Sequence, residues 1–155
     1  MLSSASWNWA CSFNVRLLAS VKSIMINPYR PDDTDTSFLA YQPFKDAATN
    51  AALPANVPQG YSLAFQNLQA SSQTTTYLGY KTIDSYDPVQ CASICDQQDG
   101  CIAFNLYFER DPTLAPNKTN CANPPSLTNI KCVRWGVHVN QTTATNKGEH
   151  RGMLP

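Results

Sequence analysis

The sequence predicts a small α+β domain with one helix, several strands and a dense cluster of cysteines. Five of the six cysteines fall within residues 91–132 of a 155-residue chain. Such a density is typical of a disulfide framework or a metal site. Segments with strand-like patterns lie on both sides of a single well-capped helix, which favours a mixed α+β fold.

The first third of the chain is expected to be an N-terminal extension or linker. Prolines punctuate residues 27–58 every few positions, which favours a poorly ordered, extended arm over 1–56 with at most one short helix near 44–52. The folded domain is then expected over 57–155.

Two strands are expected to open this domain. Apolar and polar residues alternate over 61–66, and β-forming residues fill 77–83. A helix follows, with Asp87 as N-cap, Pro88 at the first helical position and an end near Gln98, before Gly100.

Two cysteines of this helix, Cys91 and Cys95, are four residues apart and therefore share one face. Their Cβ atoms should lie about 5–6 Å apart, whereas a disulfide needs about 3.5–4.5 Å. The two cysteines should therefore not pair with each other, and each must reach a different element.

Two further strands are expected after the helix. The first covers 101–108, with apolar side chains at alternate positions on one face, and it ends at 109–112. A proline-rich loop containing Cys121 leads to the last strand, over 130–137. From Asn140 onward the sequence is polar and shows no strand pattern.

Three motifs together resemble the PAN/apple domain, and most of all a group of secreted fungal apple-like proteins. They are C-x3-C on the capped helix, CIAFN opening a strand at Cys101, and CVRWG from Cys132. The stretches GY at 79–80 and FNLYFERDP at 104–112 also fit, and the resemblance covers about 57–150. It implies a small extracellular disulfide fold, with one helix packed on an antiparallel sheet, that binds carbohydrate or protein.

The same resemblance implies that Cys95 pairs with Cys101 and Cys91 with Cys132, which would pin the helix to the sheet. Cys121 has no counterpart in the family's minimal framework, so its partner is left open between Cys11 and another chain. The family continues past Gly148 with another strand, so the resemblance implies that this copy is either truncated or divergent at its last strand.

The charge balance excludes partners that need a strong field. Lys+Arg and Asp+Glu number 11 each, and charged residues are 14% of the chain against roughly 25% in an average domain. Neither nucleic acid nor an anionic membrane surface is therefore an expected partner. The apolar stretch 15–26 is too short to span a bilayer and is broken by Arg16 and Lys22.

A secreted, extracellular location is expected from the cysteine cluster and from two glycosylation sequons, at Asn117 and Asn140. Residues 1 to about 26 show no clear signal peptide, and their serines and lack of acidic residues also fit a transit peptide. We expect instead that this stretch is not the natural start of the protein.

The sequence gives little support for a catalytic site or a metal site. Cys91, Cys95, Cys101, Cys132 and His138 could supply a zinc set, but the helical C-x3-C spacing is not that of a zinc knuckle. No phosphate loop, nucleophile elbow or H-E-x-x-H motif is present. We therefore expect no enzyme activity, no metal and no cofactor.

Binding remains the expected function. An aromatic platform for a sugar ring or a protein could draw on five residues, which are Tyr77, Tyr80, Tyr86, Tyr107 and Trp135. Of these, Tyr86, Tyr107 and Trp135 are the expected binding residues, and Tyr86 and Tyr107 are the ones most expected to be exposed. The expected function is a secreted binding module for carbohydrate or protein at the cell surface or wall. The alternatives are a wall protein cross-linked through Cys121, and a small zinc or redox protein.

Overall fold

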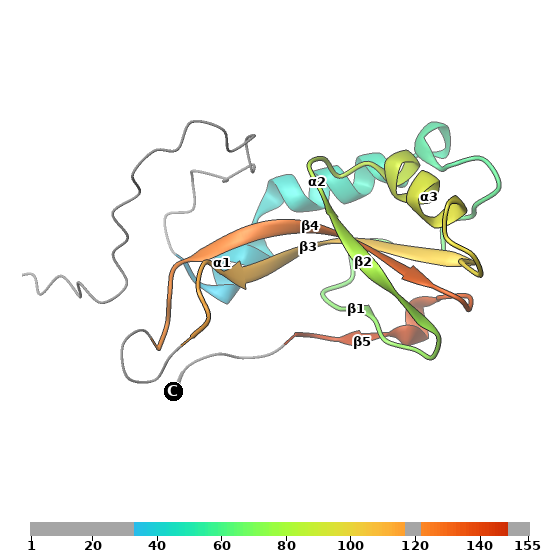
Figure 1. Cartoon of the computed structure of the whole chain (residues 1–155). Helices are drawn as coiled ribbons and strands as arrows, with labels where there is room; N and C mark the ends of the chain where they lie inside the picture. The colour runs from blue at the N-terminus through green and yellow to red at the C-terminus, as the bar shows by residue number, and fades with distance from the viewer. Residues whose placement is uncertain (1–32, 117–121, 149–155) are drawn as a thin grey trace, which may run out of the picture.

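The protein is a small α+β fold in a computed structural model that describes residues 33–116 and 122–148 (Figure 1). Its elements in chain order are α1 (Asp35–Ala40), α2 (Gln42–Ala51), the 3-10 turn η2 (Pro54–Asn56), β1 (Ser71–Ser72), β2 (Tyr77–Ile83), α3 (Pro88–Asp96), β3 (Ala103–Pro112), β4 (Ser126–Trp135), the 3-10 turn η3 (Gln141–Thr143) and β5 (Ala144–Asn146). The expected class, helix on antiparallel sheet with disulfides, is confirmed.

Two antiparallel sheets form the frame. The larger has the strand order β2-β4-β3, so the last of its three strands in the chain, β4, lies in the middle. Strands β3 and β4 pair without a break from Ala103↔Trp135 to Pro112↔Ser126. The smaller sheet is a ribbon of β1 and β5, and Figure 1 shows it on the opposite side of the large sheet from α2 and α3.

Helix α3 forms where the capping signals predict it and is fixed to the sheet by the cysteines. The Asp87 carboxylate accepts hydrogen bonds from the backbone N–H groups of Val89 and Gln90, which satisfies two donors that the first helical turn leaves unpaired. Cys91 and Cys132 are fully buried and form the core together with Ile83. The core is small, so the bridge through it carries much of the packing.

The segment before the predicted domain differs from the expected extended arm. Residues 35–56 form α1, α2 and η2, and Phe44 of α2 stacks on Phe108 of β3 with ring centroids 4.1 Å apart. The prolines that suggested an arm mark helix starts instead: Pro43 and Pro54 both sit in a first turn, where no backbone N–H is needed. Residues 27–32 lie outside the described part of the chain.

Strand boundaries differ from the sequence pattern at several points. Residues 61–66 form no strand, although Tyr61 packs its ring against Phe104 at 5.1 Å, and Leu63 is left 51% exposed. Strand β3 continues through 109–112, and β4 begins four residues before Ile130 and ends two before Val137. The polar residues 144–146 form β5, because β1 offers them a backbone partner that no local pattern reveals.

Candidate functional site

The large sheet has two chemically different faces because side chains alternate along each strand. Phe104, Leu106 and Phe108 of β3 point to the helices, and Phe104 and Leu106 pack on the core. The intervening positions point to the ribbon. We call this second surface the polar–aromatic face; its residues are Tyr77 and Tyr80 of β2, Tyr107, Glu109 and Asp111 of β3, and Lys131 of β4.

Strand register brings these six residues together. Tyr107 lies directly opposite Lys131, and Thr82 of β2 pairs with Lys131 from the other side. Between the face and the ribbon lies a recess of about 310 Å³. All residues of the face except Asp111 line it, together with Ser71, Gln73 and Asn146 on the ribbon side. That volume is at the lower end of the range for small-molecule sites.

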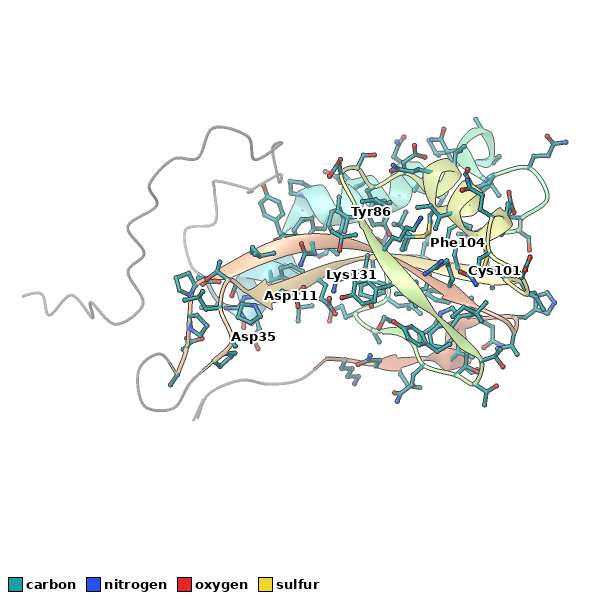
Figure 2. The ribbon with its side chains drawn as sticks, viewed as in Figure 1. Asp35, Tyr86, Cys101, Phe104, Asp111 and Lys131 are labelled. Atoms are coloured by element: carbon teal, nitrogen blue, oxygen red, sulfur yellow. A yellow bond between two sulfur atoms is a disulfide. The ribbon has the colours of Figure 1, made fainter. Side chains whose placement is uncertain are left out.

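Lys131 is the electrostatic centre of the face. Its Nζ lies 2.6 Å from a Glu109 carboxylate oxygen, 3.5 Å from an Asp111 oxygen and 4.1 Å from the centroid of the Tyr80 ring. Burial alone would lower the pKa of Lys131, but the hydrogen bond and charge of Glu109 and the charge of Asp111 outweigh it and raise the pKa. The ammonium is therefore held charged and is already paired (Figure 2).

The exposed rings on this face are Tyr77 and Tyr80, at 55% and 51% exposure. Tyr77 meets Trp135 edge-on, with ring centroids 5.5 Å apart, and Trp135 itself is only 4% exposed. The indole Nε1–H of Trp135 is buried without a hydrogen-bond partner among the described residues. Trp135 thus supports the exposed tyrosine from below and borders the recess.

Two of the three aromatic residues expected to bind occupy other roles. Trp135 is buried, and Tyr86 lies on the helix side of the sheet, where it stacks on Phe108 with centroids 4.6 Å apart and donates its hydroxyl to the Leu106 carbonyl. Burial raises the pKa of Tyr86 to about 12. Figure 2 shows Tyr86 and Phe104 on this helix side.

Tyr107 is the one residue of that set that stays on the recess side. It is half-buried and lines the recess. Burial, and next the Glu109 charge, raise the pKa of the Tyr107 phenol, while a hydrogen bond with Ser71 partly offsets them. At neutral pH its hydroxyl is therefore protonated and can both donate and accept.

The ribbon is attached to the sheet by a few polar contacts. The Ser72 backbone N–H donates to the side-chain oxygen of buried Asn105 at 2.8 Å, which is the anchor on β3. Within the ribbon, the Gln73 N–H donates to the Thr143 carbonyl at 2.8 Å. These contacts hold the ribbon over the polar–aromatic face. The two strands of the ribbon are short and polar, and they carry no hydrophobic pattern.

The cysteines of α3 form the pairs that the resemblance implied. Cys91 bonds Cys132 and Cys95 bonds Cys101, and none of the cysteines in the described ranges has a free thiol. Sulfur in a disulfide is not the thiolate that zinc requires. Within residues 33–116 and 122–148 no group of three or more His, Cys, Asp and Glu side chains could hold a metal ion.

Three residues of the sequence predictions lie outside the described part of the chain: the sequon residue Asn117 and the cysteines Cys121 and Cys11. Asn140 is described and exposed, and it caps η3. In the described part of the chain, no helix is long and apolar enough to cross a membrane.

Comparisons with protein-family models, with curated proteins and with solved structures found no match to this chain. The arguments about function therefore rest on the motifs and on the geometry of the polar–aromatic face.

Proposed function

We propose that this chain is a secreted, non-catalytic, apple-like module that binds neutral carbohydrate on its polar–aromatic face. The observation that carries the proposal is the pair of exposed rings, Tyr77 and Tyr80, beside a fixed cluster of charged groups over a recess of about 310 Å³. The apple-like motifs and the two disulfides support an extracellular setting.

The chemistry of the face suits a sugar ring. A pyranose presents apolar C–H groups on its faces, which pack well on exposed tyrosine rings, and hydroxyls around its rim, which need donors and acceptors. The acceptors are the carboxylates of Glu109 and Asp111, and the hydroxyl of Tyr107 both donates and accepts. Few convergent polar groups around an aromatic platform are typical of a small-ligand site.

The charge of the cluster favours neutral ligands over acidic ones. One ammonium, that of Lys131, faces two carboxylates, so the trio of Lys131, Glu109 and Asp111 carries one net negative charge. Both carboxylates and the Tyr80 ring already engage the ammonium. A uronate or sulfate group would therefore meet repulsion without gaining a free cation.

Binding of the full chain to a panel of soluble oligosaccharides tests the proposal. The panel pairs neutral β-glucan, mannan and chitin oligomers with acidic polygalacturonate and heparin oligomers, and titration calorimetry reads the affinity. We expect a neutral oligomer to bind and the acidic ones not to bind. The double variant Y77A/Y80A should weaken that binding about tenfold or more, and Y77F/Y80F should retain most of it.

Val89→Ala is the matched control, because Val89 is 57% exposed on α3, which lies on the other side of the sheet. It removes exposed apolar area without touching the face, so it should leave the affinity unchanged. If Y77A/Y80A binds as well as the native chain, the site is misplaced. If only acidic oligomers or a protein bind, the ligand class is wrong.

A further inference from the structure

The side chain of Asn140 serves one structural role and leaves its nitrogen free. Its Oδ1 accepts hydrogen bonds from the Thr142 backbone N–H at 2.8 Å and from the Thr142 hydroxyl at 2.6 Å, and so it caps η3. The backbone N–H of Asn140 is bonded in turn to the Thr143 hydroxyl at 3.2 Å. Among the described residues, no hydrogen bond uses Nδ2 of Asn140.

Asn140, whose Oδ1 is hydrogen-bonded and whose Nδ2 forms no hydrogen bond with the described residues, is the exposed first residue of the sequon Asn140-Gln141-Thr142. N-glycosylation modifies only the nitrogen of the amide. The sugar's anomeric carbon forms a bond to Nδ2 as its C–O bond to the lipid diphosphate of the donor breaks. The diphosphate leaves with the electron pair, and the amide nitrogen loses one proton. Oδ1 keeps its lone pairs throughout and stays an acceptor.

We propose that Asn140 is an N-glycosylation site in which the glycan and the η3 cap use different atoms of one amide, so that both are present together. The proposal shares with the proposed function only the expectation of secretion. It concerns a covalent modification and not the ligand of the polar–aromatic face, and Asn140 does not line the recess below that face.

The cap itself has a structural consequence that the glycan must not disturb. Thr143, the last residue of η3, accepts the backbone N–H of Gln73 with its carbonyl and contacts the Ser72 hydroxyl at 3.3 Å. The cap therefore positions the turn that ties the two strands of the ribbon together. A modification that took Oδ1 away from Thr142 would loosen this tie, whereas one on Nδ2 leaves it in place.

The test translates the full chain behind a cleavable secretion leader in the presence of microsomes that carry the lipid-linked oligosaccharide donor and the transferase. Protease protection establishes that the chain has entered the lumen. Peptide mass mapping, before and after enzymatic release of N-glycans, then reads Asn140 directly. We expect a glycan on Asn140 in the native chain and in Thr142→Ser, and none in Thr142→Ala or Asn140→Asp.

Stability separates the cap from the glycan. Asparagine and aspartate are both good N-caps and alanine is not. The glycosylated chain, the unmodified chain oxidised in the absence of the transferase, and Asn140→Asp, which is also the product of amidase release of the glycan, should therefore share one urea midpoint. Asn140→Ala should fall by about 0.5 M. A protected chain without sugar on Asn140 overturns the proposal. A midpoint that drops on glycosylation, or an Asn140→Asp variant as weak as Asn140→Ala, overturns the shared use of the amide.

Discussion

The two disulfides should differ in their contribution to stability, and paired alanine substitutions measure the difference. Cys91–Cys132 joins residues 41 apart, and Cys95–Cys101 joins residues only 6 apart. Loop-closure entropy assigns about 4 kcal/mol to the first bridge and about 2 kcal/mol to the second. Cys91 and Cys132 also belong to the core with Ile83, so their loss removes packing as well as a cross-link.

Urea unfolding under oxidising conditions is the assay. With a slope of about 2 kcal/mol per molar, typical of a small domain, C91A/C132A should lower the midpoint by about 2 M and C95A/C101A by about 1 M. Non-reducing mass analysis of each variant serves as the control, because it shows whether the remaining cysteines have formed a new bridge. Equal shifts, or a larger shift for the short loop, would refute the loop-closure reasoning.

Two further predictions concern local contacts. Partial burial would raise the pKa of Asp33, but hydrogen bonds from the Ser126 backbone and the Arg110 guanidinium outweigh burial and lower the pKa. The ionised Asp33 carboxylate therefore contributes its full share of folding stability at neutral pH, and this stability is lost as pH falls below about 4. Asp33→Asn should reduce the loss of stability between pH 5 and 3 seen in acid unfolding curves, by at most about 1 kcal/mol for so exposed a pair, and an unchanged curve would contradict this. Asp87→Ala should cost about 1 kcal/mol in urea unfolding because α3 loses its N-cap, and Asp87→Asn should not; equal losses would contradict the cap.

Local signals were sufficient to predict the middle of the fold. Helix α3 appears between its cap at Asp87 and the positive-φ glycine at Gly100, and β2 occupies 77–83 as expected. The spacing of Cys91 and Cys95 excluded a bridge between them, and motif resemblance then supplied the actual partners. The helix, its cap and β2 depend on residues within one or two turns of each other, so the sequence was enough to predict them. The Cys91–Cys132 bridge joins residues 41 apart, and only the family resemblance predicted it.

The candidate site could not be predicted in the same way, because it is built by long-range pairing. The bulge between Tyr77 and Tyr80 and the register of β2 on β4 decide which rings face outward. The sequence analysis favoured Tyr86, Tyr107 and Trp135. The sequence around Tyr86 and Trp135 does not show that Tyr86 lies on the helix side of the sheet and that Trp135 lies beneath Tyr77. The β2–β4 register pairs Tyr77 with Trp135 and Tyr80 with Val133, and the sequence alone does not give that register.

The ribbon was missed for a related reason. Strand β1 is two serines and β5 is Ala144–Asn146, and neither has a hydrophobic pattern. Each forms only because the other is present, with Asn105 anchoring the pair to the sheet. Local sequence patterns therefore do not predict the recess that the ribbon covers.

The strand order β2-β4-β3 sets a sequence of events for synthesis of the chain. The ribosome releases β2, α3 and β3 before the strand that joins them, so the large sheet has no pairing until residues 126–135 emerge. Cys95 and Cys101 are both available early, while Cys91 must wait for Cys132. During that interval Cys91 is an unpaired thiol beside the short-range bridge, and thiol–disulfide exchange between them would give a non-native pairing that must be reversed before Cys91 can bond Cys132.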